Sequence, residues 1–491
     1  MTRLGRDGGR APSASPAGSA RRLRLLLALL ACCLATPGRG ETLQEVLSVA
    51  YGNNPSLLAE RAQLEGTNED LPQALSNWRP TVTVTVSGGK DRLLTNQYCA
   101  FEGSQNAPLF APCGPFESTG SNVTIQKLYQ STYDVTVTQP LYRGGRTTAQ
   151  TSQAYNLINS ERAHLSAVEQ SVFLTVITDY LSVIENVELV ALNKENEEIL
   201  HKQATVTETR YHGGELTHTD LYQAEAAYAQ ATAQRKTEEG QLEAARAAYL
   251  HDVGQAPGEL VKPAVLPVLP ATLDEAEGIA AAAAPTVVQA QYAQQAAEDN
   301  VDVIRGQLLP TIQAQASYSR SNDSTAFGLK IDDKRIIAQG TLPLYEGGAI
   351  YSQSRQAQKA VEMSKHQLDD ARRAAVQAAK GAWDTLMAAR ALMADLQHSI
   401  AANEHAMNGL EEEVRVGTRT VQDVLEQQQS LFQAQVNLTT AQHDELLDEF
   451  TLVAAIGRLT AANLALPIEL YDPDKHLDAV RNKWFGFDTE P

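Results

Sequence analysis

Two stretches of this sequence are near copies of each other: Gln139-Pro-Leu-Tyr-Arg-Gly-Gly145 and Leu342-Pro-Leu-Tyr-Glu-Gly-Gly348. Their prolines are separated by 203 residues (343 − 140). The same separation relates three further pairs: Gly214 and Gly417, Asp220 and Asp423, and Gly254 and Gly457. A constant separation over so long a stretch indicates an internal duplication, and this duplication decides the fold.

The beginning of each copy matches at a longer separation. Thr42-Leu-Gln-Glu-Val46 resembles Thr272-Leu-Asp-Glu-Ala276, which starts 230 residues later (272 − 42). The copies therefore differ in length by 27 residues (230 − 203), and the whole difference lies between Pro80 and Pro140. We assign residues 41–266 to the first repeat and residues 267–491, with a C-terminal tail over 468–491, to the second.

Each copy predicts the same order of elements, beginning with an amphipathic helix. In the first copy this helix covers about Thr42–Asn77, and in the second it starts at Thr272. A Thr-x-x-Glu capping box opens both helices. Four prolines mark the junctions between helices and predicted strands: Pro80, Pro140, Pro310 and Pro343.

Alternating sequences follow the leading helices. Thr81-Val-Thr-Val-Thr-Val-Ser87 places valines on one face of a strand, and the chain returns through Tyr133–Pro140. The second copy has its strands at about 311–319 and 335–342. Runs of about nine residues suffice for a tilted strand to cross a bilayer, and the alternation suits a barrel wall between lipid and water.

A long stretch without proline follows each strand pair, over residues 141–256 and 344–466. Glycines interrupt the predicted helices at three positions: Gly213, Gly214 and Gly417. The rising arm, Thr147–Tyr211, would be ~100 Å long. The returning arm, residues 220–254, has roughly half that length. We therefore expect a leading helix and a returning arm to stack end to end against each long arm.

No stretch after Glu41 is expected to be apolar over about 18 residues, so a membrane position requires strands. Four strands cannot close a barrel, because the smallest bacterial outer-membrane barrels have about eight and an open edge is not tolerated in lipid. Three chains would supply twelve strands. The expected fold class is an α+β membrane protein, a trimeric twelve-stranded β-barrel continuous with a long periplasmic coiled-coil barrel.

The first 40 residues are typical of a secretory signal. A basic stretch at Arg21–Arg24 leads into an apolar run that ends at Leu34, and small residues before Glu41 offer a cleavage site. The run has about a dozen residues, which is too short to span a bilayer. The alternative is acylation of Cys32, as in a lipoprotein. Cleavage ranks first because Leu30 fits the lipoprotein pattern poorly.

The chain is acidic, with a formal net charge of -19. Loss of the signal would remove seven Arg and one Asp, leaving -25 (-19 − 6). Such a chain is a poor partner for nucleic acid. Cys99 and Cys113 lie in one polar segment after the signal, which predicts a disulfide that closes a small loop. No P-loop, nucleophile elbow, metalloprotease motif or dinucleotide fingerprint is present, so we expect no enzyme activity and no cofactor.

One stretch near the second predicted tip is fairly specific: Val416-Gly-Thr-Arg-Thr-Val-Gln-Asp-Val-Leu425. Together with the paired turns quoted above, it resembles the TolC family of outer-membrane efflux channels over essentially the whole mature chain. The resemblance implies a homotrimer in outer-membrane lipid, with a helical tunnel in the periplasm. It also implies an exit duct of a tripartite efflux or type I secretion system. Its partners would be a periplasmic membrane-fusion adaptor and an inner-membrane transporter of the ABC, RND or MFS type.

The resemblance further implies a gate at the periplasmic tip. Thr219, Asp220 and Arg419 match positions where hydrogen bonds and salt bridges between coiled coils hold the family's tip shut. Asp423 and Glu426 match acidic rings that line the constriction.

Helix capping is the alternative role for Asp220 and Asp423, since each opens a helix after a Gly-containing turn. If they form the gate, Arg419 offsets the repulsion of the acidic rings by bridging to Asp220. The family pattern can carry a tyrosine where this chain has Val414, and Tyr211 holds the equivalent place in the first copy.

Three tail aromatics, Trp484, Phe485 and Phe487, are expected to dock at mid-height on the helical cylinder. His212 and His218 near the first tip are interpreted as surface histidines rather than metal ligands. The competing function is a periplasmic coiled-coil adaptor or scaffold without a pore. It explains the helices and the signal, but not alternating strands at matching sites in both repeats.

Overall fold

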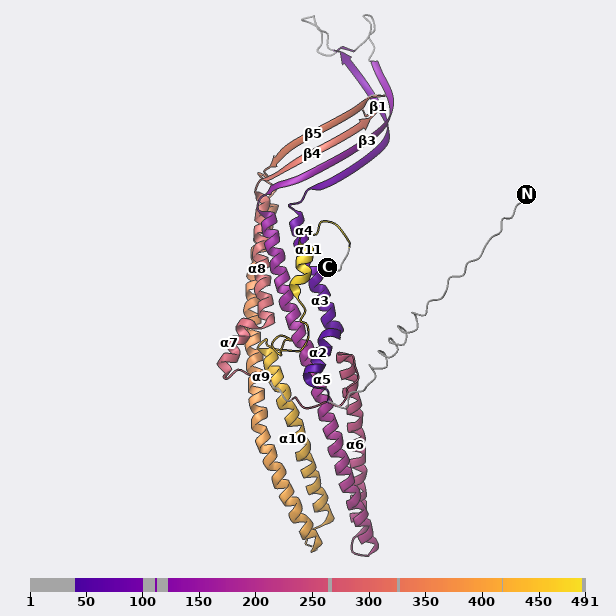
Figure 1. Ribbon diagram of the computed structural model, residues 1–491, viewed down its shortest axis with the longest axis vertical. Coiled ribbons are helices and arrows are strands. Elements are labelled where there is room, and N and C mark those ends of the chain that lie inside the picture. Colours follow the sequence, from indigo (N-terminus) through magenta and orange to yellow (C-terminus); the bar gives the residue numbers. More distant parts are fainter. Residues whose placement is uncertain are drawn as a thin grey trace, which may run out of the picture.

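The computed structural model describes residues 40–99, 111–112, 122–263, 267–324, 327–416 and 418–487. Figure 1 shows an elongated molecule with a layer of strands at one end and long helices that run to the other. Most of the predicted signal, Cys113 of the predicted disulfide, and Gly417 lie outside the described residues. Signal cleavage and the disulfide therefore stay predictions.

Antiparallel strands form the layer at the upper end of Figure 1: β1 (Thr81–Cys99), β3 (Asn122–Arg143), β4 (Thr311–Asn322) and β5 (Lys330–Thr341). The order is β2-β1-β3-β4-β5, where β2 is only Ala111–Pro112. The predicted length of about nine residues is wrong for β1 and β3, which have 19 and 22. The valine alternation stops before Gly88, but the pairing of β1 with β3 continues to Gln97 opposite Asn122. Backbone pairing does not require alternation.

Within the described part of the chain, β5 and β1 are the edges of this sheet. β5 pairs only with β4, and all its residues are exposed. β1 pairs with β3 on one side, and on its other side only its far end meets β2. Val82, Val84 and Val86 of β1 are 65–66% exposed. The sheet thus presents an apolar row and two edges with free backbone groups, which promotes pairing with another chain.

Two helices of 67 residues form the long arms: α5 (Arg146–His212) and α9 (Ala349–Arg415). Each is about 100 Å long. Each follows a Gly-Gly turn whose second glycine has a positive φ, 75° at Gly145 and 82° at Gly348. The chain returns as α6 (His218–Val253) and α10 (Val421–Ala455). These bounds agree closely with the predicted arms.

The predicted leading helices are broken into shorter ones. The first copy has α2 (Leu43–Asn53), α3 (Pro55–Asn68) and α4 (Asp70–Ser76). The second has α7 (Leu273–Ala283), α8 (Pro285–Arg305) and a 3-10 turn, η1 (Gly306–Leu308). The breaks at Pro55 and Pro285 arise because proline lacks an N–H and disfavours a helical residue before it. Thr42 forms the predicted capping box with Glu45.

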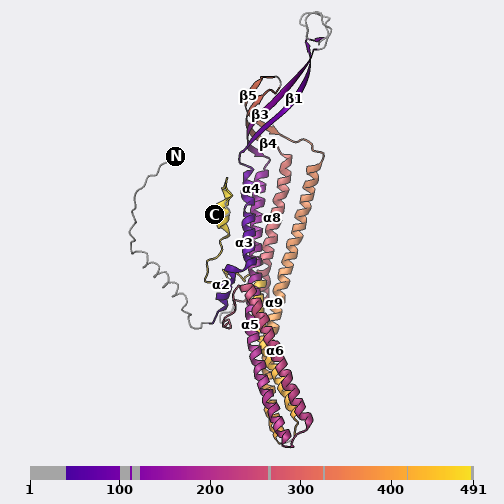
Figure 2. The same cartoon turned by 90° about the vertical axis from the view of Figure 1, so that its right-hand side faces the viewer.

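Each long helix is covered by short helices over the part near the sheet and by a returning helix over the part near the tip. α3 and α4 pack on α5, and α8 packs on both α5 and α9. Farther from the sheet, α6 runs beside α5 and α10 runs beside α9 (Figures 1 and 2). The expected end-to-end stacking is therefore present.

The largest core lies at mid-height, where α2 and the ends of α6 and α10 meet α5. Phe173, Ile177 and Tyr180 of α5 are fully buried there, beside Tyr249 of α6. One 18-residue window of α5 is apolar enough, by composition and length alone, to pass for a membrane span. The expectation that no such stretch exists is therefore wrong. The apolar side chains of α5 fill this core, and packing accounts for its composition.

The first described residues are anchored in the same region. The Tyr180 hydroxyl lies 2.9 Å from the Glu41 carbonyl and 2.5 Å from the Val261 carbonyl. The backbone N–H of Glu41 donates to the Glu259 carbonyl at 2.8 Å. Burial raises the pKa of Tyr180 to about 12, so its hydroxyl keeps its proton at neutral pH. Glu41 is thus fixed against the connection between α6 and α7.

The C-terminal helix α11 (Pro473–Arg481) runs along α3 and α4. Its inner face is buried at three residues: His476, Leu477 and Val480. Beyond it, Arg79 donates to the Lys483 carbonyl at 2.8 Å, and its guanidinium lies 4.9 Å from the centre of the Trp484 ring. Arg79 comes just before β1. The predicted docking of the tail aromatics at mid-height is therefore wrong, because Trp484 lies at the junction with the sheet.

Candidate functional site

Two helical turns form the end of the molecule opposite the sheet (Figure 1). In the first, α5 ends at His212 and Thr217 caps α6. Gly214 in this turn has a φ of 85°, a conformation that favours glycine. Asp220 Oδ2 accepts from the Thr217 backbone N–H at 2.9 Å, and Thr217 Oγ1 accepts from the Asp220 N–H at 3.3 Å. This is a complete capping box, so Asp220 is engaged within its own helix.

The second turn repeats this geometry. Asp423 Oδ2 accepts from the Thr420 backbone N–H at 2.9 Å, and Thr420 Oγ1 accepts from the Asp423 N–H at 3.3 Å. The two caps are separated by the same 203 residues (420 − 217). Hydrogen bonds from Thr217 lower the pKa of Asp220, and hydrogen bonds from Thr420, with a smaller effect of Arg419, lower that of Asp423. Both aspartates therefore stay ionised at neutral pH.

Sequence reasoning missed the two capping threonines. The pattern Thr-x-x-Asp occurs at both Thr217 and Thr420, and it is the signal that could have identified them.

Arg419 does not reach Asp220 within the chain. Its Nε lies 3.2 Å from Glu413 Oε2, and its Nη1 lies 4.0 Å from Asp423 Oδ1. Within one chain, Thr217 holds Asp220 and Arg419 pairs with acids of its own hairpin, so the bridge between Arg419 and Asp220 stays a prediction for the assembled tips. Glu413, which the sequence reasoning did not include, belongs to a run of three glutamates at 411–413.

The remaining predicted gate residues are exposed. Thr219 lies in the first turn of α6, and Glu426 accepts from Gln422 Nε2 at 2.8 Å. Residues 411–426 hold five acidic residues and two arginines, a formal charge of -3 (2 − 5). The second tip is thus negatively charged, with Arg419 offsetting part of that charge at close range.

The two tips differ in their aromatic residues. Tyr211 holds the place equivalent to Val414, and its hydroxyl lies 2.6 Å from Nε2 of His218. The His218 ring stacks on Tyr222 with their centres 5.7 Å apart. Among the described residues, no group of three or more His, Cys, Asp or Glu is arranged to hold a metal ion. His212 also contacts an aromatic ring, that of Tyr211, with the ring centres 5.4 Å apart.

The two hairpins touch each other above the tips. Leu200, Val421 and Leu425 belong to a small buried cluster that also contains Ala231. Gln428 Nε2 donates to Asn196 Oδ1 at 3.2 Å in a buried position. Beside these contacts, a groove of 600 Å³ lies between α5, α6 and α10, with several glutamines in its walls.

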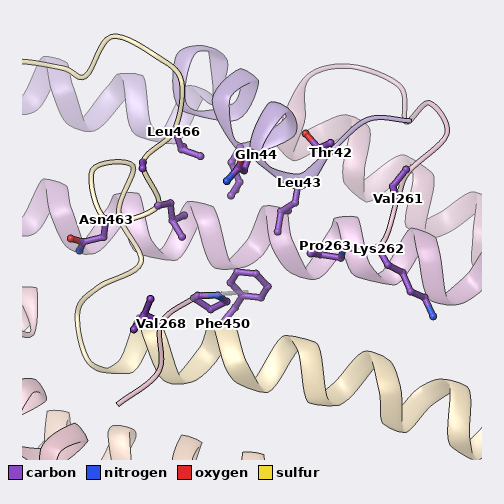
Figure 3. Close-up of a pocket in the computed structure, with 14 residues that line it drawn as sticks. Thr42, Leu43, Gln44, Val261, Lys262, Pro263, Val268, Phe450, Asn463 and Leu466 are labelled. Atoms are coloured by element: carbon purple, nitrogen blue, oxygen red, sulfur yellow. The ribbon is translucent and has the colours of Figure 1, made fainter. Parts of the chain in front are cut away.

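A second cavity, of 410 Å³, lies at mid-height between α2, the end of α10 and two connecting segments (Figure 3). Leu43, Phe450 and Leu466 contribute apolar side chains to its wall. Lys262, the basic residue among its described lining residues, pairs with Glu188 at 2.9 Å. Apolar side chains dominate the described lining of this cavity, which lies where the connecting segments cross.

Comparison with known proteins identifies the family. The sequence matches the family described as "Outer membrane efflux protein" over residues 46–250 and 278–458. The outer membrane efflux protein BepC of Brucella suis biovar 1 (strain 1330) is 31% identical over 454 residues, covering 91% of this chain and 92% of BepC. The outer membrane protein TolC of Escherichia coli (strain K12) is 24% identical, covering 90% of this chain and 87% of TolC.

The fold is also that of a solved channel. The CmeC outer membrane channel of Campylobacter jejuni superposes with a TM-score of 0.70 at 16% identity, covering 90% of this chain and 89% of that one. The resemblance to the TolC family is therefore confirmed, and with it a location in the outer membrane with an extension into the periplasm. The chain belongs to the outer membrane efflux protein family, a family of channel and transport proteins rather than enzymes.

Proposed function

We propose that three copies of this chain assemble into a passive exit duct through the outer membrane. The observation that carries the proposal is the sheet, which is mounted on helices of about 100 Å and whose edges, β1 and β5, are open among the described residues. In lipid, an open edge leaves backbone N–H and C=O groups without partners. Pairing of β5 in one copy with β1 in the next removes both edges, and three sheets give twelve long strands.

The repeated elements support the same assembly. α5 and α9 have 67 residues each, and their returning partners have 36 and 35. We take these as an internal duplication, with the first repeat over residues 41–266 and the second, including the tail from 468, over 267–491. Three chains then place six similar helical units around one axis, which suits a closed cylinder.

The tips of this cylinder form the gate in our proposal. Asp423 and Glu426 of three copies surround the axis, and three tips of charge -3 bring -9 together (3 × -3). Repulsion between them opposes closure, and Arg419 reduces it by pairing with Glu413 and Asp423. Thr219 and Asp220 of a neighbouring copy face this ring across the seam between hairpins.

The duct works with partners that supply energy. A periplasmic membrane-fusion adaptor would join it to an inner-membrane transporter of the ABC, RND or MFS type. Relatives named as an efflux protein and as protease secretion proteins support service in efflux and in type I secretion. The transporter, rather than this chain, would choose the cargo.

Gel mobility and conductance together test the proposal. We expect the purified protein to migrate as a trimer in SDS until it is heated, and to produce current steps of uniform size in planar bilayers. A periplasmic scaffold without a pore, the competing function, would fractionate as a soluble protein and produce no current. A monomeric, non-conducting protein in detergent and lipid would refute the duct.

A further inference from the structure

The tail after α11 exposes an unusual amount of aromatic surface. Trp484 is 57% exposed, Phe485 is 88% exposed and Phe487 is fully exposed. Three large exposed aromatic rings within four residues cost free energy in water, so they indicate a surface that something apolar covers.

The structure holds this segment at a defined height. Arg162 and Asp474 form an ion pair at 2.5 Å at the beginning of α11, and the Arg481 guanidinium lies 5.9 Å from the centre of the Tyr155 ring at its end. Beyond α11, Arg79 binds the Lys483 carbonyl and lies over the Trp484 ring. The aromatic segment is therefore fixed beside the residue that leads into Pro80 and the first strand.

In the proposed duct, on which this inference rests, the strands lie in the outer membrane and the helices in the periplasm. The height of this segment is then the boundary between membrane and periplasm. Trp78, which is 39% exposed, lies at the same junction, and its carbonyl accepts from Gln139 Nε2 of β3 at 2.8 Å. Tryptophan and other aromatics are enriched at such boundaries because their rings are apolar while their edges tolerate the headgroup region.

We propose that Trp484-Phe485-Gly486-Phe487 is an interfacial anchor that enters the periplasmic leaflet of the outer membrane. The occupant of this surface is phospholipid, with Phe485 and Phe487 at the glycerol ends of the acyl chains and Arg79 near the phosphate groups. The anchor is separate from the barrel wall, and it braces the helical cylinder against the membrane from outside the sheet. It depends on the outer-membrane location and does not depend on the gate.

Three tryptophans make a direct test possible, because each can be kept alone while the other two are replaced by phenylalanine: Trp78, Trp383 and Trp484. Each full-length variant is reconstituted in phosphatidylcholine vesicles, with bromine near the glycerol end or near the methyl end of the acyl chain. Bromine quenches tryptophan fluorescence on contact. We expect Trp484 to be quenched about twofold more strongly than Trp383, and more by bromine near the glycerol end. Trp383 lies about 50 Å along α9 and serves as the periplasmic control.

The outcomes separate this inference from the proposed function. Quenching of Trp78 without quenching of Trp484 would agree with a membrane-inserted sheet and would overturn the proposed anchor. A blue-shifted but unquenched Trp484 shows that another protein chain covers it, which also overturns the anchor. Replacing Phe485 and Phe487 by serine in the Trp484 variant should reduce the quenching to the level of Trp383. Unchanged quenching would overturn the role of these two rings.

Discussion

Replacing Asp179 by asparagine should stabilise the mid-height core above neutral pH. Asp179 lies on α5 within hydrogen-bonding reach of Asp252 near the end of α6. The Asp252 carbonyl accepts from Asn54 Nδ2 at 3.0 Å, so the pair lies where α2, α5 and α6 converge. Burial, the hydrogen bond with Asp252 and the charge of Asp252 raise the pKa of Asp179 to about 7, although His251 acts in the opposite direction.

The sign of the pH dependence follows from this pKa. Because the pKa of folded Asp179 lies above its ordinary value of 3.8, the folded protein binds more protons than the unfolded chain between these values. The stability that the pair contributes is complete below about pH 4 and is lost as the pH rises through about 7. The difference between the two pKa values corresponds to at most ~4 kcal/mol. Asp179 is only half-buried, so solvent screening reduces the effect to about 1–2 kcal/mol.

Hydrogen exchange of the α5 amides around Asp179 measures this effect locally. In Asp179→Asn these amides should exchange about 5- to 30-fold more slowly than in the wild type at pH 8. The two proteins should differ little at pH 5, where the wild-type carboxyl is protonated. Asp369→Asn, on an exposed part of α9, is the matched control and should change neither rate. The same ratio of rates at both pH values would refute the claim that the pKa of Asp179 is raised to about 7 in the folded protein.

Three further predictions concern the tips. Arg419→Ser should raise the leak conductance in planar bilayers, because it removes the cation between Glu413 and Asp423, whereas Arg415→Ser should not; equal conductance of Arg419→Ser and wild type would contradict the gate. Asp423→Asn should weaken block by trivalent cations added from the periplasmic side, because it removes one acidic ring, and equal block in both proteins would exclude that ring. Thr217→Ala should lose ~1 kcal/mol of capping and speed amide exchange about fivefold in the first turn of α6. Thr217→Ser should preserve the slow exchange, and equal rates in all three proteins would show that the cap contributes nothing.

The helical part of the fold could be predicted closely from the sequence. Stretches without proline set the limits of α5 and α9: both begin after a Gly-Gly turn, and each ends within two residues of a glycine, since glycine and proline act on the backbone locally. The break between α2 and α3 at Pro55 was not predicted, because a proline can either bend a helix or begin a new one. The length of β1 could not be predicted, because residues 88–97 pair through backbone groups that carry no side-chain pattern.

The positions of the candidate site residues at the tips could be predicted from the sequence, but their ion-pair and hydrogen-bond partners could not. The resemblance and the repeat separation located Asp220, Arg419 and Asp423 at the tips. Neither the resemblance nor the repeat separation gives distances between side chains. The sequence therefore could not show that Glu413 lies closer to Arg419 within the chain than Asp220 does. The tail was misplaced for a related reason. Trp484 is held by Arg79, about 400 residues earlier in the chain, and no local pattern reports a contact over such a separation.

Single-particle imaging of the full-length protein in lipid nanodiscs shows whether three sheets close one barrel over one helical cylinder. We expect a threefold particle in which β5 of each chain pairs with β1 of the next, with a continuous lumen that narrows at Asp423. A particle of different symmetry, a sheet whose edges stay open, or a helical bundle without a lumen would contradict this expectation.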